Sequence, residues 1–186
     1  MTATITPSTP STPLDGGPLE GRVSRIAVAV TRIVVGVTFL HEAAWKRPPD
    51  FGMETDSGLW QWANFAVDYP VFLPYSWFVE HVVQPNFVLF GWATFFLEAG
   101  VGAFLILGLF TRVAALAGLV QALAITWSVL NQPVFAEWDY AYYLFIGAHL
   151  AVLGTAAGRY YGVDGVLRPL WQRSGGRLAR VLLRIS

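Results

Sequence analysis

Five ionisable side chains stand in segments of the sequence that are otherwise apolar. They are Arg32, His41, Glu42, Glu98 and His149. Glu98 lies in the run FLEAGVGAFLILGLFTRVAAL, where an ionised carboxylate needs a cation, water or a proton beside it. Arginine and histidine can donate hydrogen bonds to a carbonyl, and a carboxyl group can deliver protons. These residue types therefore predict a proton site or a site for a ligand with a carbonyl group.

A structural ion pair explains the same residues equally well. We prefer Arg32 as the partner of Glu98, because a guanidinium cannot shed its charge and a charge within the bilayer costs roughly 2.5 to 3.5 kcal/mol. At about 1.5 Å per helical residue, the two groups differ in height by roughly 5 to 11 Å. A bridge through water or His149, or a pair between Glu98 and His41, are the alternatives.

Haem and metal centres are not expected. His41 and His149 could form a bis-histidine haem site only if they lay at one height, and the helical rise separates them by about 10 Å. The sequence contains no cysteine, which excludes disulfides, thiolate metal ligands and iron–sulfur clusters within this chain. We therefore expect no haem, iron–sulfur cluster or metal.

The composition predicts a membrane protein. Of the 186 residues, 55% are hydrophobic and only 13% are charged, more apolar surface than a soluble domain of this size can hide. Four apolar segments, residues 25–45, 87–110, 113–130 and 140–157, approach or exceed the roughly 18 to 20 residues that cross a bilayer as a helix. We expect an all-α, polytopic protein built as a four-transmembrane-helix bundle.

The arginines predict the orientation. Arg22 and Arg25 precede the first apolar segment, Arg112 separates the second from the third, and residues 159–184 after the fourth are rich in arginine. The two other connections carry most of the acidic residues. Since basic flanks stay in the cytoplasm, both termini should be cytoplasmic, in the inner (plasma) membrane of a bacterial cell.

The remaining segments divide the chain into three parts. Residues 1–21 are rich in Thr, Ser, Pro and Gly and predict a disordered cytoplasmic tail, residues 22–168 the membrane domain, and residues 169–186 a basic amphipathic cytoplasmic tail that lies on the membrane surface. The aromatic outer loop, residues 48–85, predicts one or two short interfacial helices. An alternative is that this loop is a lid over a lipid-like substrate.

The chain resembles the DoxX family of small membrane proteins. The run LEAGVGAFLILGLFTRVAAL contains the family's Gly-Leu-X-Thr-Arg turn, and TRIVVGVTFLHEAAWK and AGRYYGVDGVLRP are similar to its first helix and its last turn. WKRPPDFG and GVDGVLR are most similar to the DoxD branch, which is named for a membrane subunit of thiosulfate:quinone oxidoreductase. The resemblance spans about residues 25–168.

This resemblance implies a quinone-linked membrane subunit of a redox system. The alternatives are a non-catalytic membrane anchor or scaffold for a redox or oxidative-stress complex, and a small proton-coupled transporter. Membrane lipids and a protein partner or a second copy are the expected partners, and nucleic acid is not. The candidate proton or quinone site is Glu98, Arg32 and His149, and the candidate quinone contacts are His41, Glu42 and Trp45.

Overall fold

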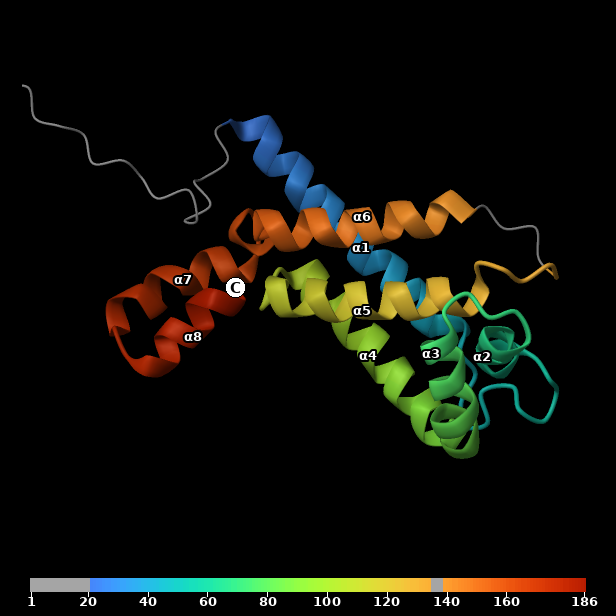
Figure 1. Cartoon of the computed structure of the whole chain (residues 1–186). Coiled ribbons are helices and arrows are strands. Elements are labelled where there is room, and N and C mark those ends of the chain that lie inside the picture. The colour runs from blue at the N-terminus through green and yellow to red at the C-terminus, as the bar shows by residue number, and fades with distance from the viewer. Residues whose placement is uncertain (1–20, 135–138) are drawn as a thin grey trace, which may run out of the picture.

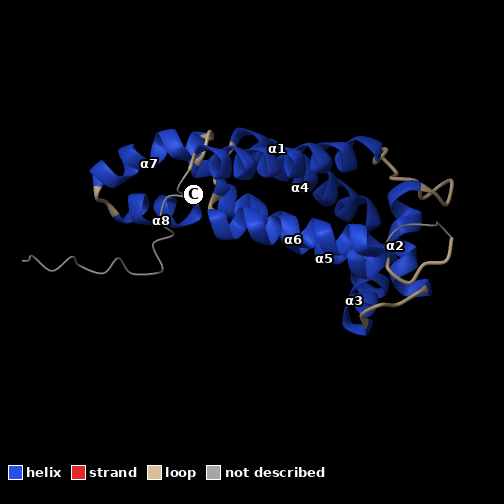
Figure 2. Cartoon of the chain, turned by 90° about the horizontal axis from the view of Figure 1, so that it is seen from above, coloured by secondary structure: helices blue, strands red, loops and turns tan. Residues whose placement is uncertain are grey.

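Four long helices form the body of the protein (Figure 1). The structure is a computed structural model that describes residues 21–134 and 139–186, and every regular element in these ranges is helical. The long helices are α1 (Arg22–Trp45), α4 (Phe87–Leu107), α5 (Thr111–Val129) and α6 (Asp139–Thr155). Figure 2 shows α1 and α4 in one layer and α5 and α6 in the other. The all-α prediction is confirmed, whereas the predicted disordered tail falls, except for residue 21, outside the described residues.

Three helical stretches are long and apolar enough to cross a membrane. They are Arg22–Trp45, Leu73–Leu107 and Thr111–Val129, counted over the described part of the chain. α6 contains 17 residues, which gives a length of about 26 Å against roughly 30 Å of hydrocarbon. By length and composition, three membrane-spanning helices are supported among the described residues, and the expected count of four is not confirmed.

α1 and α4 cross at a pair of glycines. A Cβ atom on Gly36 would lie 2.9 Å from the carbonyl oxygen of Gly102, and one on Gly102 would lie 2.8 Å from the carbonyl oxygen of Gly36. Any side chain here would force the helices apart. In lipid, helices associate largely through such close backbone packing. The buried side chains of Phe39 and Leu105 extend the contact into the core.

Arg32 joins α1 to the end of α4. Gly108 ends α4 in the left-handed conformation (φ 68°), and the Arg32 guanidinium packs so closely against it that a Cβ there would lie 2.1 Å from Nη1. Nη1 donates hydrogen bonds to the carbonyl oxygens of Leu105 (2.7 Å) and Ile106 (3.1 Å), and Nη2 donates to that of Tyr161 (3.3 Å). The buried guanidinium therefore binds carbonyls of the last turn of α4 and joins them to the segment before α7.

Asp164 holds the start of α5 from the other side. It lies in the first turn of α7 (Val163–Ser174) and is completely buried. Its carboxylate accepts hydrogen bonds from the backbone amides of Phe110 (2.8 Å) and Thr111 (3.0 Å). Gly158 makes room for this contact, because a Cβ there would lie 2.4 Å from Asp164 Oδ2. The Gly-Leu-Phe-Thr turn is thus fixed by an arginine from α1 and an aspartate from α7.

The outer loop folds into short helices, as expected. α2 (Gly58–Asp68) and α3 (Leu73–Phe78) lie at one end of the bundle (Figures 1 and 2). A π-helical turn, Val79–Val83, and a 3₁₀ turn, Gln84–Asn86, connect α3 to α4. The chain therefore continues as one helical stretch from α3 into α4. Pro85 has no backbone N–H, and the helix changes from α-helical to π and 3₁₀ hydrogen bonding around it.

Contacts of Phe51 and Tyr75 are among those that attach this loop to the bundle. Phe51 is fully buried against Gly91 of α4, where a Cβ would lie 2.4 Å from its ring. The hydroxyls of Tyr75 and Ser128 lie 3.2 Å apart and join α3 to α5. The loop is therefore packed onto the bundle.

The C-terminal segment forms a helical hairpin at the opposite end. α7 and α8 (Arg177–Ile185) extend beyond the ends of the long helices, away from α2 and α3 (Figures 1 and 2). A short 3₁₀ turn, Ala157–Arg159, leads into the hairpin from α6. α8 buries Ala179, and Arg168 Nη1 of α7 donates to the carbonyl oxygen of Leu183 at 2.7 Å. The tail expected on the membrane surface is thus folded back on α7.

Candidate functional site

A cavity of about 540 Å³ lies among the long helices at the end that carries α2 and α3. Pockets for small organic ligands are typically about 300 to 1,000 Å³ and mostly apolar. Aromatic rings from five helices form much of its wall: Trp45, Trp62, Tyr75, Phe78, Phe90 and Phe145. The cavity therefore has the size and lining of a site for a flat apolar ligand.

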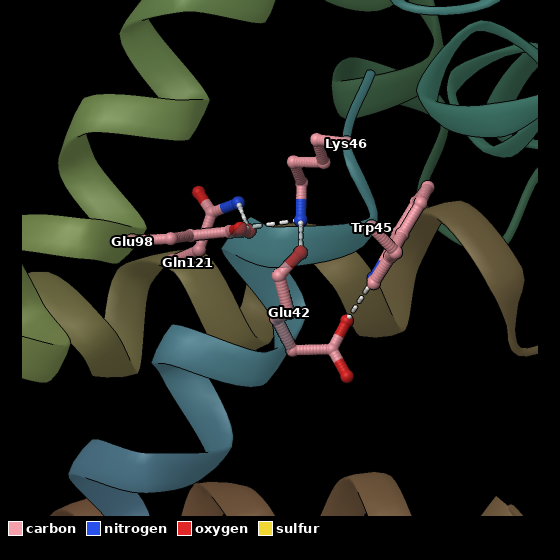
Figure 3. A network of polar contacts seen from close by, with 5 residues as sticks. All are labelled: Glu42, Trp45, Lys46, Glu98 and Gln121. Carbon is pink, nitrogen blue, oxygen red and sulfur yellow. Dashed lines mark hydrogen bonds and ion pairs between the residues drawn. The ribbon is translucent and has the colours of Figure 1, made fainter.

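A buried ion pair lines this cavity, and Figure 3 shows the polar contacts around it. Lys46 Nζ contacts Glu98 Oε2, and the two side chains are 3% and 0% exposed. Gln121 Nε2 donates to Glu98 Oε1 at 3.0 Å, and Lys46 Nζ also donates to the carbonyl oxygen of Glu42 at 2.8 Å. Glu98 Oε2 faces the ammonium group and accepts no hydrogen bond from any other described residue.

Lys46 reaches Glu98 because it stands at the very end of α1. Its stem lies back along the last helical turn, in the direction in which helical side chains lean, so that Nζ meets the otherwise unpaired carbonyl of Glu42. The same ammonium then serves as the counterion of Glu98. The end of α1 thus positions the Lys46 ammonium group inside the bundle, although the backbone of Lys46 already lies outside the helix.

Two of the predicted ligand contacts line the cavity. Trp45 Nε1 donates to Glu42 Oε2 at 2.8 Å, and the Trp45 ring centroid lies 4.5 Å from Lys46 Nζ. Trp45 and Glu42 are therefore held in fixed orientations beside the ion pair. The third predicted contact, His41, is exposed and does not line the cavity.

The expected ion pair between Arg32 and Glu98 is wrong. The Arg32 guanidinium is satisfied by the carbonyls at the end of α4, and Glu98 has Lys46 as its cation. Arg32 and Glu98 therefore remain apart, at different heights along the bundle, and each has its own partners. Arg32 does not line the cavity, and its hydrogen bonds stabilise the end of α4 instead.

His149 is also separate from the cavity. Its ring is fully buried and meets Phe39 and Phe145 edge-on, with ring centroids 5.2 and 4.7 Å away. Nδ1 carries the proton, since it lies 2.8 Å from the carbonyl oxygen of Phe145, which can only accept. Gly118 lies against Nε2 and would clash with it if it had a Cβ. Glu98 is therefore the only one of the three predicted proton-site residues that lines the cavity.

Two residues of the site were missed from the sequence. Lys46 was not among the predicted site residues, although it is the only lysine in a chain that otherwise uses arginine. Gln121 is an isolated amide in the apolar segment that became α5. Both signals were visible in the sequence, but only the packing of α1, α4 and α5 brings these side chains to Glu98.

Comparison with known proteins places the chain in a family. The protein-family model described as the TQO small subunit DoxD matches residues 64–182, which include α3 to α7 and most of α8. The match therefore omits α1 and extends past the range of the resemblance seen in the sequence. No curated protein and no solved structure matches the chain. The matched region covers more than half of the sequence, and the expected DoxD relationship is confirmed: the chain belongs to the DoxD family.

Proposed function

We propose that this membrane subunit binds a quinone headgroup in the cavity beside Lys46, Glu98 and Gln121. The observation that carries the proposal is the position of these groups, since a buried cation, carboxylate and amide meet in the wall of a largely apolar cavity that is rich in aromatic rings. A quinone has matching parts, namely a flat apolar ring and carbonyl oxygens. The family description, TQO small subunit, supports a quinone link of this kind.

The residues fit the chemistry that such a ligand needs. The Lys46 ammonium can donate a hydrogen bond to a carbonyl oxygen, and the aromatic walls can stack on the ring. The Glu98 carboxylate can take up a proton at Oε2, which has no hydrogen-bond donor besides Lys46 among the described residues, and can then pass that proton to a ligand oxygen. Gln121 holds the other carboxylate oxygen in place. This chain has no cysteine, so a partner subunit would supply the electrons.

We also propose α6 as a fourth membrane crossing, with both termini in the cytoplasm. α6 packs against α5 and α1 and returns the chain to the end where α1 begins (Figure 1). The arginine-rich flanks then share one side of the membrane, which agrees with the positive-inside rule. Residues 22–168 would form the membrane domain, and α2 and α3 would cover the cavity on the outer side.

Quinone titration of the purified full chain tests the cavity. Trp45 and Trp62 line it, so a short-chain quinone should quench tryptophan fluorescence saturably in mild detergent. Ala124→Phe fills the cavity without changing a charge and should abolish saturable quenching. Ala151→Phe, at an exposed position of α6, is the matched control and should bind as the unsubstituted chain does.

The same titration separates the alternatives. A chain that never binds quinone and that purifies only with a second subunit would be a membrane anchor or scaffold. Proton-dependent flux of a solute in liposomes, abolished by Glu98→Gln, would instead indicate a transporter. Equal quenching in both alanine variants would place the quinone outside this cavity.

A further inference from the structure

Three arginines gather at the end of the bundle opposite the cavity. Arg112 lies in the first turn of α5, Arg159 in the 3₁₀ turn after α6, and Arg168 in α7. Burial lowers the pKa of Arg159, and the charges of Arg168 and Arg112 lower it further. Burial and then the charge of Arg112 lower the pKa of Arg168 in the same way. Arg112 therefore acts as a nearby like charge on both Arg159 and Arg168, and Arg168 does so on Arg159.

Two of these side chains are held in place by α8. Arg112 Nη1 donates to the carbonyl oxygen of Arg184 at 3.4 Å, and Arg168 Nη1 donates to that of Leu183 at 2.7 Å. Nε of Arg112 and Nε of Arg159 are buried and have no acceptor within the described ranges. A buried donor without an acceptor is costly, so both positions are prepared for a ligand that can accept hydrogen bonds.

The oxygens that lie near the cluster among the described residues are already engaged, since Arg168 Nη1 also donates to the carbonyl oxygen (3.2 Å) and the hydroxyl (2.7 Å) of Ser186. Asp164 is the carboxylate that attracts Arg159 and Arg168, but its two oxygens already accept the amides of Phe110 and Thr111. Neither of the ion pairs found between described residues involves the three arginines. The structure thus concentrates positive charge around unused donors.

We propose that Arg112, Arg159 and Arg168 bind the phosphate group of an anionic phospholipid. Arginine forks match the oxygens of a phosphate and form strong, charge-assisted hydrogen bonds with it. This site is independent of the proposed quinone cavity, which lies at the other end of the molecule. It would fix a lipid where the turn between α4 and α5 meets the hairpin of α7 and α8.

The position favours a lipid over free phosphate. Thr111 begins a membrane-spanning helix, so Arg112 stands at the level where headgroups meet water. Val113 and Leu116, the next apolar residues of α5, are 48% and 52% exposed and can contact an acyl chain. Phosphate in solution offers the same oxygens but no such chain.

Lipid titration by native mass spectrometry tests this site. The full chain, in a non-ionic detergent, should retain phosphatidylglycerol more strongly than phosphatidylcholine. Arg112→Gln with Arg159→Gln should weaken phosphatidylglycerol binding at least about tenfold, because strong hydrogen bonds to charged groups are lost. The charge-matched control, Arg22→Gln with Arg173→Gln, removes two exposed arginines outside the cluster and should leave binding within about twofold.

Several outcomes would overturn the proposal. Equal weakening in the two double variants would mean diffuse attraction by net charge, and equal retention of both lipids would mean no preference for an anionic headgroup. A thermal shift with inorganic phosphate as large as that with phosphatidylglycerol would assign the site to a soluble anion. If the site variant melts early, Arg159→Lys replaces it, since lysine keeps the charge but loses the fork, and unchanged binding there would also refute the site.

Discussion

At the scale of single residues, the cavity depends on how Lys46 and Glu98 neutralise each other. Both side chains are almost completely buried, and an isolated charge in that position would cost several kcal/mol. The pair keeps a carboxylate inside the bundle, beside a cavity, while leaving one of its oxygens able to accept another hydrogen bond. This combination distinguishes Glu98 from Arg32, whose hydrogen bonds all go to backbone carbonyls.

We predict strong coupling between Lys46 and Glu98. Lys46→Met and Glu98→Gln should each destabilise the protein by about 3 to 5 kcal/mol, since either one leaves a buried charge unpaired. The double variant should recover part of that loss. Thermal melting of the detergent-solubilised chain measures all four proteins.

The matched control for this cycle is Arg32→Gln combined with Glu98→Gln. These two residues share no contact, so their effects should add. Additive losses for Lys46 and Glu98 would show that the pair does not form in the membrane.

We predict that Asp164 stabilises the turn between α4 and α5. Asp164→Ala leaves the amides of Phe110 and Thr111 without acceptors, at about 1 to 3 kcal/mol each. Asp164→Asn keeps one acceptor oxygen and should lose about half as much. The melting temperatures of the two variants measure these losses of stability. If Asp164→Ala melted at the same temperature as the unsubstituted chain, Asp164 would not stabilise the turn.

At the scale of helices, close packing and membrane exposure divide the glycines into two kinds. Gly36 and Gly102 face each other at the crossing of α1 and α4, whereas Gly147 and Gly154 of α6 have no neighbouring atom within 4 Å of a built Cβ. A spacing of small residues in the sequence therefore does not by itself identify a packed face. On α6, the open face is available to lipid.

We predict that Gly36→Ala disrupts the helix crossing and Gly147→Ala does not. The added methyl at Gly36 meets backbone atoms at 2.9 to 3.0 Å, so α1 and α4 must separate at a cost of about 1 to 3 kcal/mol. At Gly147 the methyl meets nothing and helix propensity improves by about 1 kcal/mol. Melting of both variants in the same detergent checks this, and equal destabilisation would be inconsistent with the crossing.

At the scale of the whole molecule, the two ends have different chemistry. The arginine cluster and the α7–α8 hairpin lie at one end, and the aromatic helices with the cavity lie at the other (Figures 1 and 2). In the proposed orientation, with the basic end in the cytoplasm, the cavity would face the outer half of the membrane. The proposed lipid site and the proposed quinone site would then serve opposite leaflets.

We predict the topology that follows from this polarity. Tags at residue 10 and after Ser186 should be inaccessible to a membrane-impermeant reagent in intact cells, and a tag inserted near Asp56 should be accessible. Permeabilised cells are the control and should expose all three. If α6 did not cross, the tags at residue 10 and after Ser186 would lie on opposite sides, and labelling of only one of them would refute the four-span topology.

The sequence alone determined the class of protein, the positions of the long helices and the family. Those properties depend on composition, on the length of apolar runs and on short motifs such as the Gly-Leu-Phe-Thr turn, all of which are local along the chain. The isolated Glu98 was also a sound starting point, because a lone carboxylate in an apolar segment must be satisfied somehow.

Only the tertiary structure decided which groups pair with the Glu98 carboxylate. Helical rise gives the height of a Cα atom but not the direction or reach of a long side chain, so Arg32 was chosen for Glu98 and Lys46 was not. The structure shows that helix ends supply carbonyls to Arg32 and to Lys46, and that Asp164 reaches the start of α5 across 53 residues of sequence. Such partners lie far apart in the chain, and they meet because backbone contacts at a few glycines set how closely the helices pack.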